Sequence, residues 1–239
     1  MDINSDMGEG FGAWEMGNDA LLLNYITSTN IACGWHAGDP SRMKKLVEMA
    51  TQKGVRIGAH PGLPDLEGFG RREMAITEQD AYDYVLYQAG ALKAFIDAAG
   101  NTLHHVKPHG ALYNQAAKDM KLARGIARAV KDLGSEVILY GLAGSCMIDA
   151  AKELNVPVWQ EVFADRRYTK EGFLVPRSQV GAVIEDEAVA LNQVIGMSKD
   201  GKVTSIDGSE IKLQADTLCI HGDNPHAVEF AKKIKAALA

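Results

Sequence analysis

The sequence predicts a single α/β domain over residues 1–239, built as a seven-stranded, TIM-like (β/α) barrel. Three observations favour this fold: strand and helix patterns alternate seven times, most connections are short, and six of the seven strands end in polar loops. Strands joined through helices run parallel under the right-handed crossover rule, and seven strands are enough to close a barrel. An open doubly wound sheet is the competing architecture, but it would bind ligands mainly at one switch point and leave the other polar loops without purpose.

The composition limits the class of protein. A chain of 239 residues with 46% hydrophobic and 23% charged residues can bury a large core in one domain. A net charge of -6 and a pI of about 5.6 disfavour nucleic acid and anionic membrane surfaces as partners. No apolar run reaches the roughly 18 residues of a spanning helix, and the N-terminus lacks a signal pattern, so we expect a cytoplasmic protein. Three widely spaced cysteines argue against a disulfide framework.

The first two strand-to-helix units each bring ionisable groups to a strand end. A strand expected at residues 1–4 runs into a loop with three glycines and the carboxylates of Asp6 and Glu9, which either ligate a metal, bind a substrate or form a solvated turn. The second strand, expected at 28–34 and including Asn30, leads to His36. A histidine between a strand and a helix is a ligand or acid-base group more often than a core residue. The following helix is expected at 40–53, because Asp39 and Pro40 form an N-cap with proline at the first position.

The third unit carries a histidine and the longest loop. A strand at 55–58 ends at His60, and a loop rich in Gly and Pro then leads through Arg71 and Arg72 to a helix at about 78–99. A long loop over a strand end is usually a lid or a substrate contact. The alternative is that the two arginines are solvated charges.

The fourth unit has the densest chemistry. A strand at 103–107 stops at Pro108, which removes a backbone donor, so that Lys107 and His109 lie where the strand ends, with Tyr113 close behind. A charged strand end followed by glycine is where an α/β barrel places its chemistry.

The remaining units complete the barrel. The fifth strand, at 137–140, ends without an ionisable group and is expected to be structural. The sixth carries Glu161 and ends at Asp165 and Arg166, and the seventh ends at His221 and Asp223. The other expected elements are a helix at 119–133, strands at 156–162 and 217–220, helices at 184–197 and 225–238, and a hairpin insertion on an Asp-Gly turn at about 202–213.

The set of polar residues indicates a type of chemistry. The chain has no Walker A loop, no strand-bound GxGxxG and no GxSxG elbow, so it offers no motif for an ATPase fold, a dinucleotide site or a serine hydrolase. Carboxylates, imidazoles, a lysine and arginines remain. That set suits hydrolysis at a carbonyl, in which a metal or cation polarises the oxygen and a carboxylate or histidine activates water.

Seven segments together resemble the LamB/YcsF family, the A subunits of bacterial 5-oxoprolinase. The segments are residues 4–12, 30–39, 58–62, 68–72, 105–114, 161–166 and 221–223. The resemblance runs from Met1 to the C-terminal helix. It departs from the family at Ser5, where a cysteine is usual, and at Trp35, where a phenylalanine is usual. Ser5 rules out a thiol nucleophile at that position, and Trp35 changes only the pocket wall.

The resemblance implies a subunit that opens the lactam of 5-oxo-L-proline to L-glutamate, coupled to ATP hydrolysis at the level of a complex with two further subunits, B and C. It also implies a barrel of the glycoside hydrolase/deacetylase type. In relatives of that fold an Asp and histidines hold a divalent metal, and Asp6, His36 and His60 are the nearest counterparts by position. Two alternatives stay open: a stand-alone metal-dependent amide deacetylase, and a subunit that only binds 5-oxoproline for its partners.

These considerations give a set of predicted site residues. We expect the carboxylate of 5-oxoproline to bind Arg71, Arg72 or Lys107, and Asp6, His60 or His109 to activate water. The predicted catalytic residues are Asp6, His60, Lys107 and His109; the predicted substrate-binding residues are Glu9, Asn30, Arg71, Arg72, Tyr113, Glu161, Asp165, Arg166, His221 and Asp223.

Overall fold

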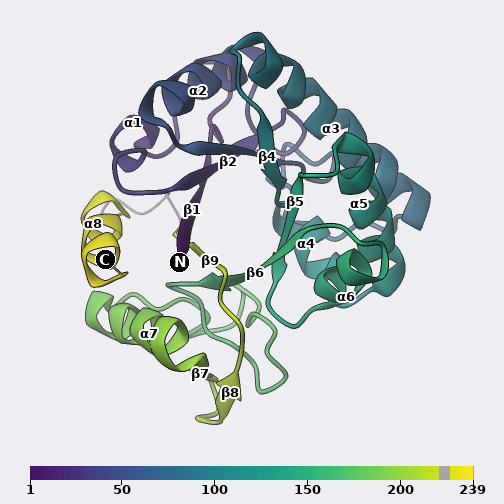
Figure 1. Cartoon of the computed structure of the whole chain (residues 1–239). Helices are drawn as coiled ribbons and strands as arrows, with labels where there is room; N and C mark the ends of the chain where they lie inside the picture. The colour runs from purple at the N-terminus through teal and green to yellow at the C-terminus, as the bar shows by residue number, and fades with distance from the viewer. Residues whose placement is uncertain (221–226, 239) are drawn as a thin grey trace.

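Seven parallel strands close into a barrel in the computed structural model, which describes residues 1–220 and 227–238 (Figure 1). The strand order is β1-β2-β3-β4-β5-β6-β9, and β9 closes the ring by pairing with both β1 and β6. The strands are β1 (Asp2–Met7), β2 (Ser28–Ala32), β3 (Arg56–His60), β4 (Leu103–Val106), β5 (Ile138–Leu142), β6 (Val158–Phe163) and β9 (Thr217–Cys219). The barrel was predicted and is confirmed, and the open sheet is excluded.

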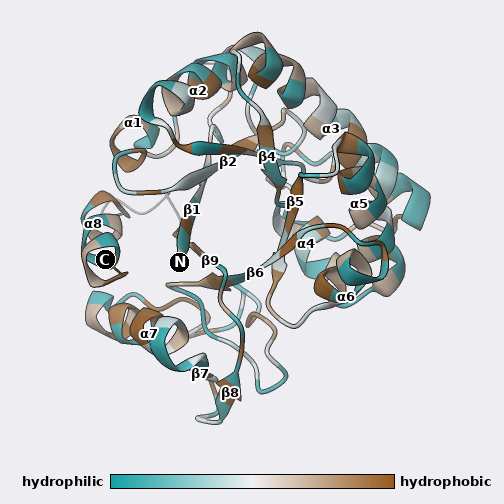
Figure 2. Cartoon of the chain, in the orientation of Figure 1, coloured by the Kyte–Doolittle hydropathy of each residue, from teal (hydrophilic) through white to brown (hydrophobic). Residues whose placement is uncertain are grey.

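Helices surround the barrel, and most carry hydrophilic and hydrophobic residues together (Figures 1 and 2). They are α1 (Asp19–Leu22), α2 (Pro40–Lys53), α3 (Glu78–Ala98), α4 (Gly110–Ala116), α5 (Met120–Leu133), α6 (Cys146–Glu153), α7 (Glu187–Asp200) and α8 (Ala227–Leu238). An antiparallel pair, β7 (Lys202–Thr204) and β8 (Glu210–Lys212), forms the hairpin outside the barrel. In the described residues no helix is long and apolar enough to cross a membrane.

The capping signals placed α2 correctly, and other boundaries differ from prediction. The Asp39 carboxylate accepts hydrogen bonds from the first free N–H groups of α2, and Gly54 ends the helix with a φ of 66°. The prediction ended the first strand at residue 4, which is wrong: β1 continues to Met7 because its ladder with β2 spans residues 4–7. Asp6 therefore lies within a strand. The helical pattern at 19–25 predicts a longer helix than α1 (Asp19–Leu22), and α4 and α6 were not predicted.

The barrel interior is polar, whereas branched aliphatic side chains usually fill such a core. Asn4 donates to Glu161 Oε1 (3.1 Å) and Thr217 Oγ1 (2.7 Å), and Asn30 donates to Asn4 Oδ1 (2.7 Å). His105 Nε2 bonds Asn30 Oδ1 at 2.6 Å. These side chains are all buried. Because buried polar groups are stable only when they are paired, this network fixes the orientation of each side chain below the barrel mouth.

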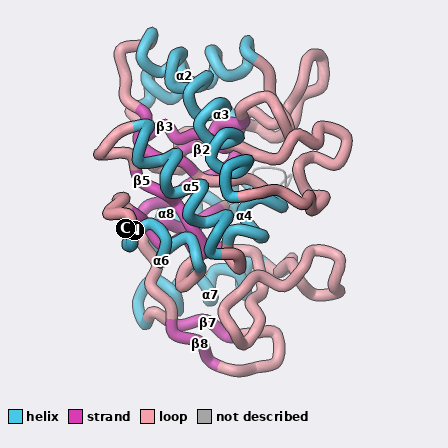
Figure 3. Tube along the Cα trace, turned by 90° about the vertical axis from the view of Figure 1, so that its right-hand side faces the viewer, coloured by secondary structure: helices cyan, strands magenta, loops and turns pink. Residues whose placement is uncertain are grey.

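Two glycines allow the close packing of the barrel and its outer layer. A Cβ at Gly58 in β3 would lie 2.1 Å from His105 Nε2, so only glycine leaves room for that imidazole. A Cβ at Gly125 in α5 would lie 2.2 Å from the Glu78 carbonyl oxygen at the start of α3. Glycine therefore lets the two long helices approach backbone to backbone. The long loops of the chain gather on one side of the molecule (right in Figure 3).

Candidate active site

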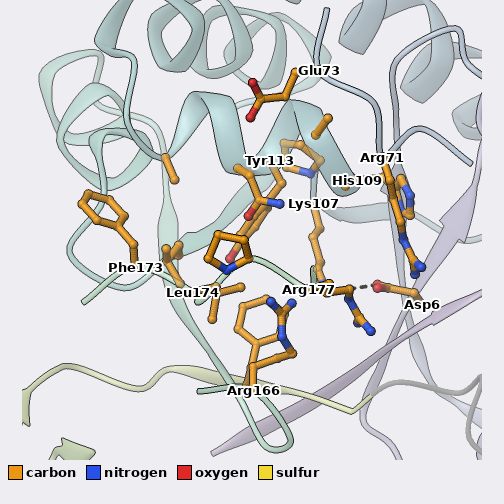
Figure 4. Close-up of a pocket in the computed structure, with 18 of the residues that line it drawn as sticks. Asp6, Arg71, Glu73, Lys107, His109, Tyr113, Arg166, Phe173, Leu174 and Arg177 are labelled. Atoms are coloured by element: carbon orange, nitrogen blue, oxygen red, sulfur yellow. Dashed lines mark hydrogen bonds and ion pairs between the residues drawn. The ribbon is translucent and has the colours of Figure 1, made fainter. Parts of the chain in front are cut away.

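A cavity of about 420 Å³ opens at the mouth of the barrel, where the strands end (Figure 4). Its polar lining includes Asp6, Glu9, His60, Lys107 and His109 from the first four units, and Arg71, Arg166 and Arg177 from two loops. Tyr113, Phe163, Phe173 and Leu174 supply apolar and aromatic wall. The topology thus brings together, in one cavity, groups that are far apart in the sequence.

Three histidines cluster at one end of the site: His60 and His109 line the cavity, and His36, which does not line it, packs against both. The rings of His36 and His109 stack with centroids 3.8 Å apart and planes 3° apart, and His60 stands edge-on to both. All three are buried. A Cβ at Gly62 would lie 2.5 Å from His36 Nδ1, and one at Gly70 would lie 2.7 Å from His36 Cβ. Because neither glycine has a Cβ, the imidazole of His36 has room to lie in this position.

Backbone carbonyls orient two of these rings. His60 Nδ1 donates to the Lys107 carbonyl oxygen at 2.7 Å, and His109 Nε2 donates to the Phe69 carbonyl oxygen at 2.8 Å. The remaining ring nitrogens, His60 Nε2 and His109 Nδ1, then face each other at 3.0 Å. Both point toward the cavity side of the cluster, where Glu9 and Asp6 also lie.

The Glu9 carboxylate lies against all three imidazoles. Its Oε1 is 3.6 Å from His36 Nε2, 3.5 Å from His109 Nδ1 and 4.0 Å from His60 Nε2. Burial raises the pKa of Glu9, and burial together with the neighbouring imidazoles lowers the pKa of both His36 and His109 well below the usual range. One ligand atom from each of these four residues lies within 4.8 Å of all the others. The residues present therefore fit a metal ion.

Lys107 forms the centre of a buried ionic network. Its Nζ lies 3.0 Å from Asp6 Oδ1, 2.8 Å from Glu161 Oε1 and 3.2 Å from Asn4 Oδ1. The Tyr113 hydroxyl donates to the other Glu161 oxygen at 2.7 Å. Burial acts to lower the pKa of Lys107, but the nearby acidic groups outweigh it and hold that pKa well above its usual value. Lys107 is therefore a fixed cation whose charge is already balanced by carboxylates.

Arginines occupy the other end of the cavity, where Figure 4 shows Arg166 and Arg177 side by side. Arg166 is buried, donates to the Val175 carbonyl oxygen at 2.6 Å, and has a pKa lowered to about 10, mainly by burial and then by the charge of Arg177. Its Nε has no hydrogen-bond partner among the described residues. Sequence reasoning did not select Arg177 or the apolar wall at Phe173 and Leu174. The sequence feature that could have indicated these residues is the long loop with Gly and Pro after the sixth strand, because such loops often contact ligands.

Some predicted residues lie outside the cavity. Arg72 is mostly exposed and donates from Nε to Asp65 Oδ1 at 2.9 Å, so it braces its own loop. Asp165 does not line the cavity, and Asn30 and Glu161 belong to the polar interior beneath it. His221 and Asp223 lie outside the described residues.

The metal set predicted from the resemblance changes in one respect. His36 and His60 meet as expected, but the other members of the compact group are Glu9 and His109. Asp6 Oδ1 is 3.4 Å from His60 Nε2 and already accepts hydrogen bonds from Lys107 (3.0 Å) and Asn30 (2.7 Å). Position after a strand could not distinguish Asp6 from Glu9, because β1 extends past the predicted end and directs Asp6 toward Lys107.

The arrangement combines the parts needed for attack on a carbonyl. A carboxylate beside a fixed cation and an imidazole cluster can orient water and stabilise negative charge on oxygen. The arginine end can hold an anionic group of the same small molecule. Water is partly excluded because most of these groups are buried.

The sequence profile of the LamB/YcsF family matches residues 1–239. Proteins of Bordetella pertussis and Bacillus subtilis, both named as A subunits of 5-oxoprolinase, are 58% and 54% identical over 100% of this chain, and the matches cover 94% and 93% of their own lengths. A crystal structure of the lactam utilization protein from Thermus thermophilus superposes with a TM-score of 0.92 at 46% identity, covering 99% of this chain and 95% of that one. Each comparison spans the barrel and the loops that build the cavity. The chain therefore belongs to the LamB/YcsF family.

Proposed function

We propose that the chain is the component of a 5-oxoprolinase that binds 5-oxo-L-proline and opens its lactam to L-glutamate. The observation that best supports this function is that one cavity has carboxylates and imidazoles at one end and arginines at the other. 5-Oxoproline has the matching pair of groups, an amide carbonyl and a carboxylate on one small ring. The names of the full-length relatives support this reading over a stand-alone deacetylase.

The substrate carboxylate belongs at the arginine end. Lys107 is paired with Asp6 and Glu161, so binding a third carboxylate there would add an unbalanced negative charge. Arg166 is buried and lines the cavity, and a guanidinium binds a carboxylate through two parallel hydrogen bonds. We place the carboxylate at Arg166, with Arg177 contributing positive charge. The lactam carbonyl then points to the imidazole end.

The ring opening needs an activated carbonyl, because amide resonance stabilises the lactam. Transfer of the γ-phosphoryl group of ATP to the lactam oxygen creates a phosphate leaving group. Water then adds to that carbon, the ring C–N bond breaks and the nitrogen gains a proton, which leaves the acyl phosphate of glutamate. A second water hydrolyses this acyl phosphate to L-glutamate and phosphate. This chain has no Walker A loop, so we assign ATP use to the complex with two further subunits, B and C.

Asp6 is the group that accepts the proton of the attacking water in this proposal. It lies on the cavity wall, and Asn30 and Lys107 fix its orientation. His60 and His109 each use one ring nitrogen on a backbone carbonyl, which leaves them to hold the site together. A divalent cation at the imidazoles would supply Lewis-acid polarisation of the carbonyl oxygen.

The test is turnover of 5-oxoproline with ATP by the complex reconstituted with variants of this chain. Asp6→Asn is expected to lower kcat by a factor of about 100 or more, and Arg166→Gln to raise KM by a factor of about 10 to 100. The matched controls are Asp149→Asn on the exposed side of α6 and Arg124→Gln at the exposed pair with Glu153, and both should behave like the wild type.

The outcomes separate the alternatives. No ATP-dependent glutamate formation by the wild-type complex would contradict the proposed function. Unchanged kcat in Asp6→Asn, with 5-oxoproline still binding the isolated chain, would indicate a binding subunit whose partners hold the chemistry. Release of acetate from an N-acetyl substrate by the isolated chain would favour the deacetylase.

A further inference from the structure

We infer that Glu9, His36, His60 and His109 bind a single first-row transition-metal ion of the Zn²⁺ class. The four residues come from the loops after β1 and β2, the last position of β3 and the residue preceding α4. The inference does not depend on the lactam reaction, because it concerns only which ion the four side chains hold.

The hydrogen bonds of His60 and His109 show which ring nitrogen of each carries the proton. A carbonyl oxygen only accepts, so the proton of His60 must be on Nδ1, bonded to Lys107 O, and that of His109 on Nε2, bonded to Phe69 O. In the neutral rings, His60 Nε2 and His109 Nδ1 are then both acceptors. They nevertheless face each other at 3.0 Å. Two lone pairs held this close need a positive centre, either a proton or a metal ion, between or beside them.

Three buried polar atoms of the cluster, two on His36 and one on Glu9, have no hydrogen-bond partner among the described residues. His36 is 0% exposed, and neither of its ring nitrogens has a hydrogen-bond partner among the described residues. The Glu9 Oε1 atom is also buried without a partner there, 3.6 Å from His36 Nε2. Leaving a buried polar atom unpaired costs about 1–3 kcal/mol each. A cation bound to His36 and Glu9 would satisfy one nitrogen of the ring and this oxygen together.

The spacing of the ligand atoms fits a small cation. Zn–N and Zn–O bonds of about 2.0–2.1 Å place tetrahedral ligands roughly 3.3 Å apart. The separations are 3.0 Å for His60 and His109, 3.5 Å for His109 and Glu9, 3.6 Å for His36 and Glu9, and 4.0 Å for His60 and Glu9. The carbonyls behind His60 and His109 fix the tautomers that metal-bound histidines need.

The donor set selects the class of ion. Three imidazoles and one carboxylate suit Zn²⁺, Co²⁺ or similar ions, whereas Mg²⁺ and Ca²⁺ prefer oxygen donors. Asp6 lies outside the compact four-residue group, and its Oδ1 accepts hydrogen bonds from Lys107 and Asn30.

The experiment measures metal binding without any assay of activity. The full chain is stripped with a chelator, dialysed and titrated with Co²⁺, following visible d–d absorption, and with Zn²⁺ by calorimetry. We expect one equivalent of either ion and an increase in Tm of the wild type with Zn²⁺. His36→Gln, His109→Gln and Glu9→Gln should each weaken Zn²⁺ binding by a factor of about 10 to 100 or more.

Two variants keep the assignment falsifiable. His104→Gln removes a histidine of β4 outside the four-residue group, and Asp6→Asn removes the adjacent carboxylate; both should retain one equivalent with less than a tenfold change in Kd. Near-UV circular dichroism of the metal-free variants checks folding. Absence of Co²⁺ absorption and of Zn²⁺ binding by the wild type would overturn the inference, as would a loss on Asp6→Asn equal to that on His36→Gln.

Discussion

At the scale of single residues, the site consists of two groups of side chains whose opposite charges or hydrogen-bonding atoms face each other. Glu9 and the histidines form one group, and Lys107 with its carboxylates forms another directly below. Residue type and strand-end position were enough to predict that Asp6, His60, Lys107 and His109 line one cavity. The pairings could not be predicted, because they depend on whether a side chain one or two positions along a strand faces the barrel axis.

Lys107 is expected to contribute strongly to stability. Lys107→Met would leave the carboxylate of Glu161 and that of Asp6 in the interior without their cation, at a cost of about 3–5 kcal/mol in the free energy of unfolding. The double variant Lys107→Met/Glu161→Gln removes one of the stranded charges and should recover part of the loss. Urea unfolding of the three proteins gives the comparison, and equal stability of the single and double variants would contradict this account.

Asp19 predicts a pH-dependent contribution to stability. Burial raises its pKa to about 6 from 3.8, while its Oδ2 accepts the Gly8 N–H at 3.0 Å. The folded state therefore holds the proton more tightly than the unfolded state. Stability from this group is present below pH 4, is lost as pH rises toward 6, and is constant above.

Asp19→Asn removes that loss and retains an acceptor for Gly8. The variant should match the wild type at pH 3.5 to 4 and be more stable by about 2–3 kcal/mol at pH 7. Chemical unfolding of both proteins across pH 4 to 7 measures the difference directly. A difference that does not change with pH would show that the carboxyl group is not the cause.

At the scale of elements, capping chemistry was readable from the sequence and strand length was not. Asp39 opens α2 as expected, and a capping box formed by Thr77 and Asp80 opens α3. The extension of β1 through Asp6 depends on its ladder with β2, which the residues of β1 alone do not reveal. Helix α4 was missed because Gly110, with a φ of 52°, is a poor signal for a helix start.

Replacing one glycine in α3 and one in α5, two helices that pack against each other, should have opposite effects on stability. Gly125→Ala places a methyl group 2.2 Å from the Glu78 carbonyl and should destabilise the fold by about 1–3 kcal/mol as α3 and α5 move apart. Gly90→Ala in α3 meets no atom within 4 Å and should stabilise by about 0.5–1 kcal/mol. Thermal unfolding of the two variants tests this; a similar change in Tm for both would refute the packing argument.

At the scale of the whole molecule, alternation of elements predicted the barrel, because parallel strands with short crossovers have few ways to close. The polar interior was not predicted. The alternating Asp2, Asn4 and Asp6 were noted only as a non-apolar N-terminus, yet Asn4 and Asp6 bond to Glu161 of β6 and to Lys107 after β4. Short buried strands do not show in sequence which face meets the axis.

Closure by β9 should be required for folding, whereas the hairpin should not. A chain ending at Asp216 lacks the strand that pairs with both β1 and β6, leaving two open edges. We expect it to lose cooperative unfolding and to aggregate. Replacing residues 202–213 by a short Gly-rich linker keeps every barrel pair and should retain a cooperative transition. Circular dichroism melting and size-exclusion chromatography distinguish these outcomes, and a cooperative monomer from the truncated chain would be the contrary result.

The arginine end of the cavity comes from a different stretch of chain than the acid and imidazole end. Arg166, Arg177 and the wall at Phe173 lie between β6 and α7, while the imidazole end is complete by His109. Under the proposed function, changes within residues 166–177 alter the end of the cavity that binds the substrate carboxylate and leave Asp6 and the imidazole end unchanged. Ring preference could then change by substitution in this loop alone, and a library of variants confined to it would be the direct route to a protein that accepts other lactams.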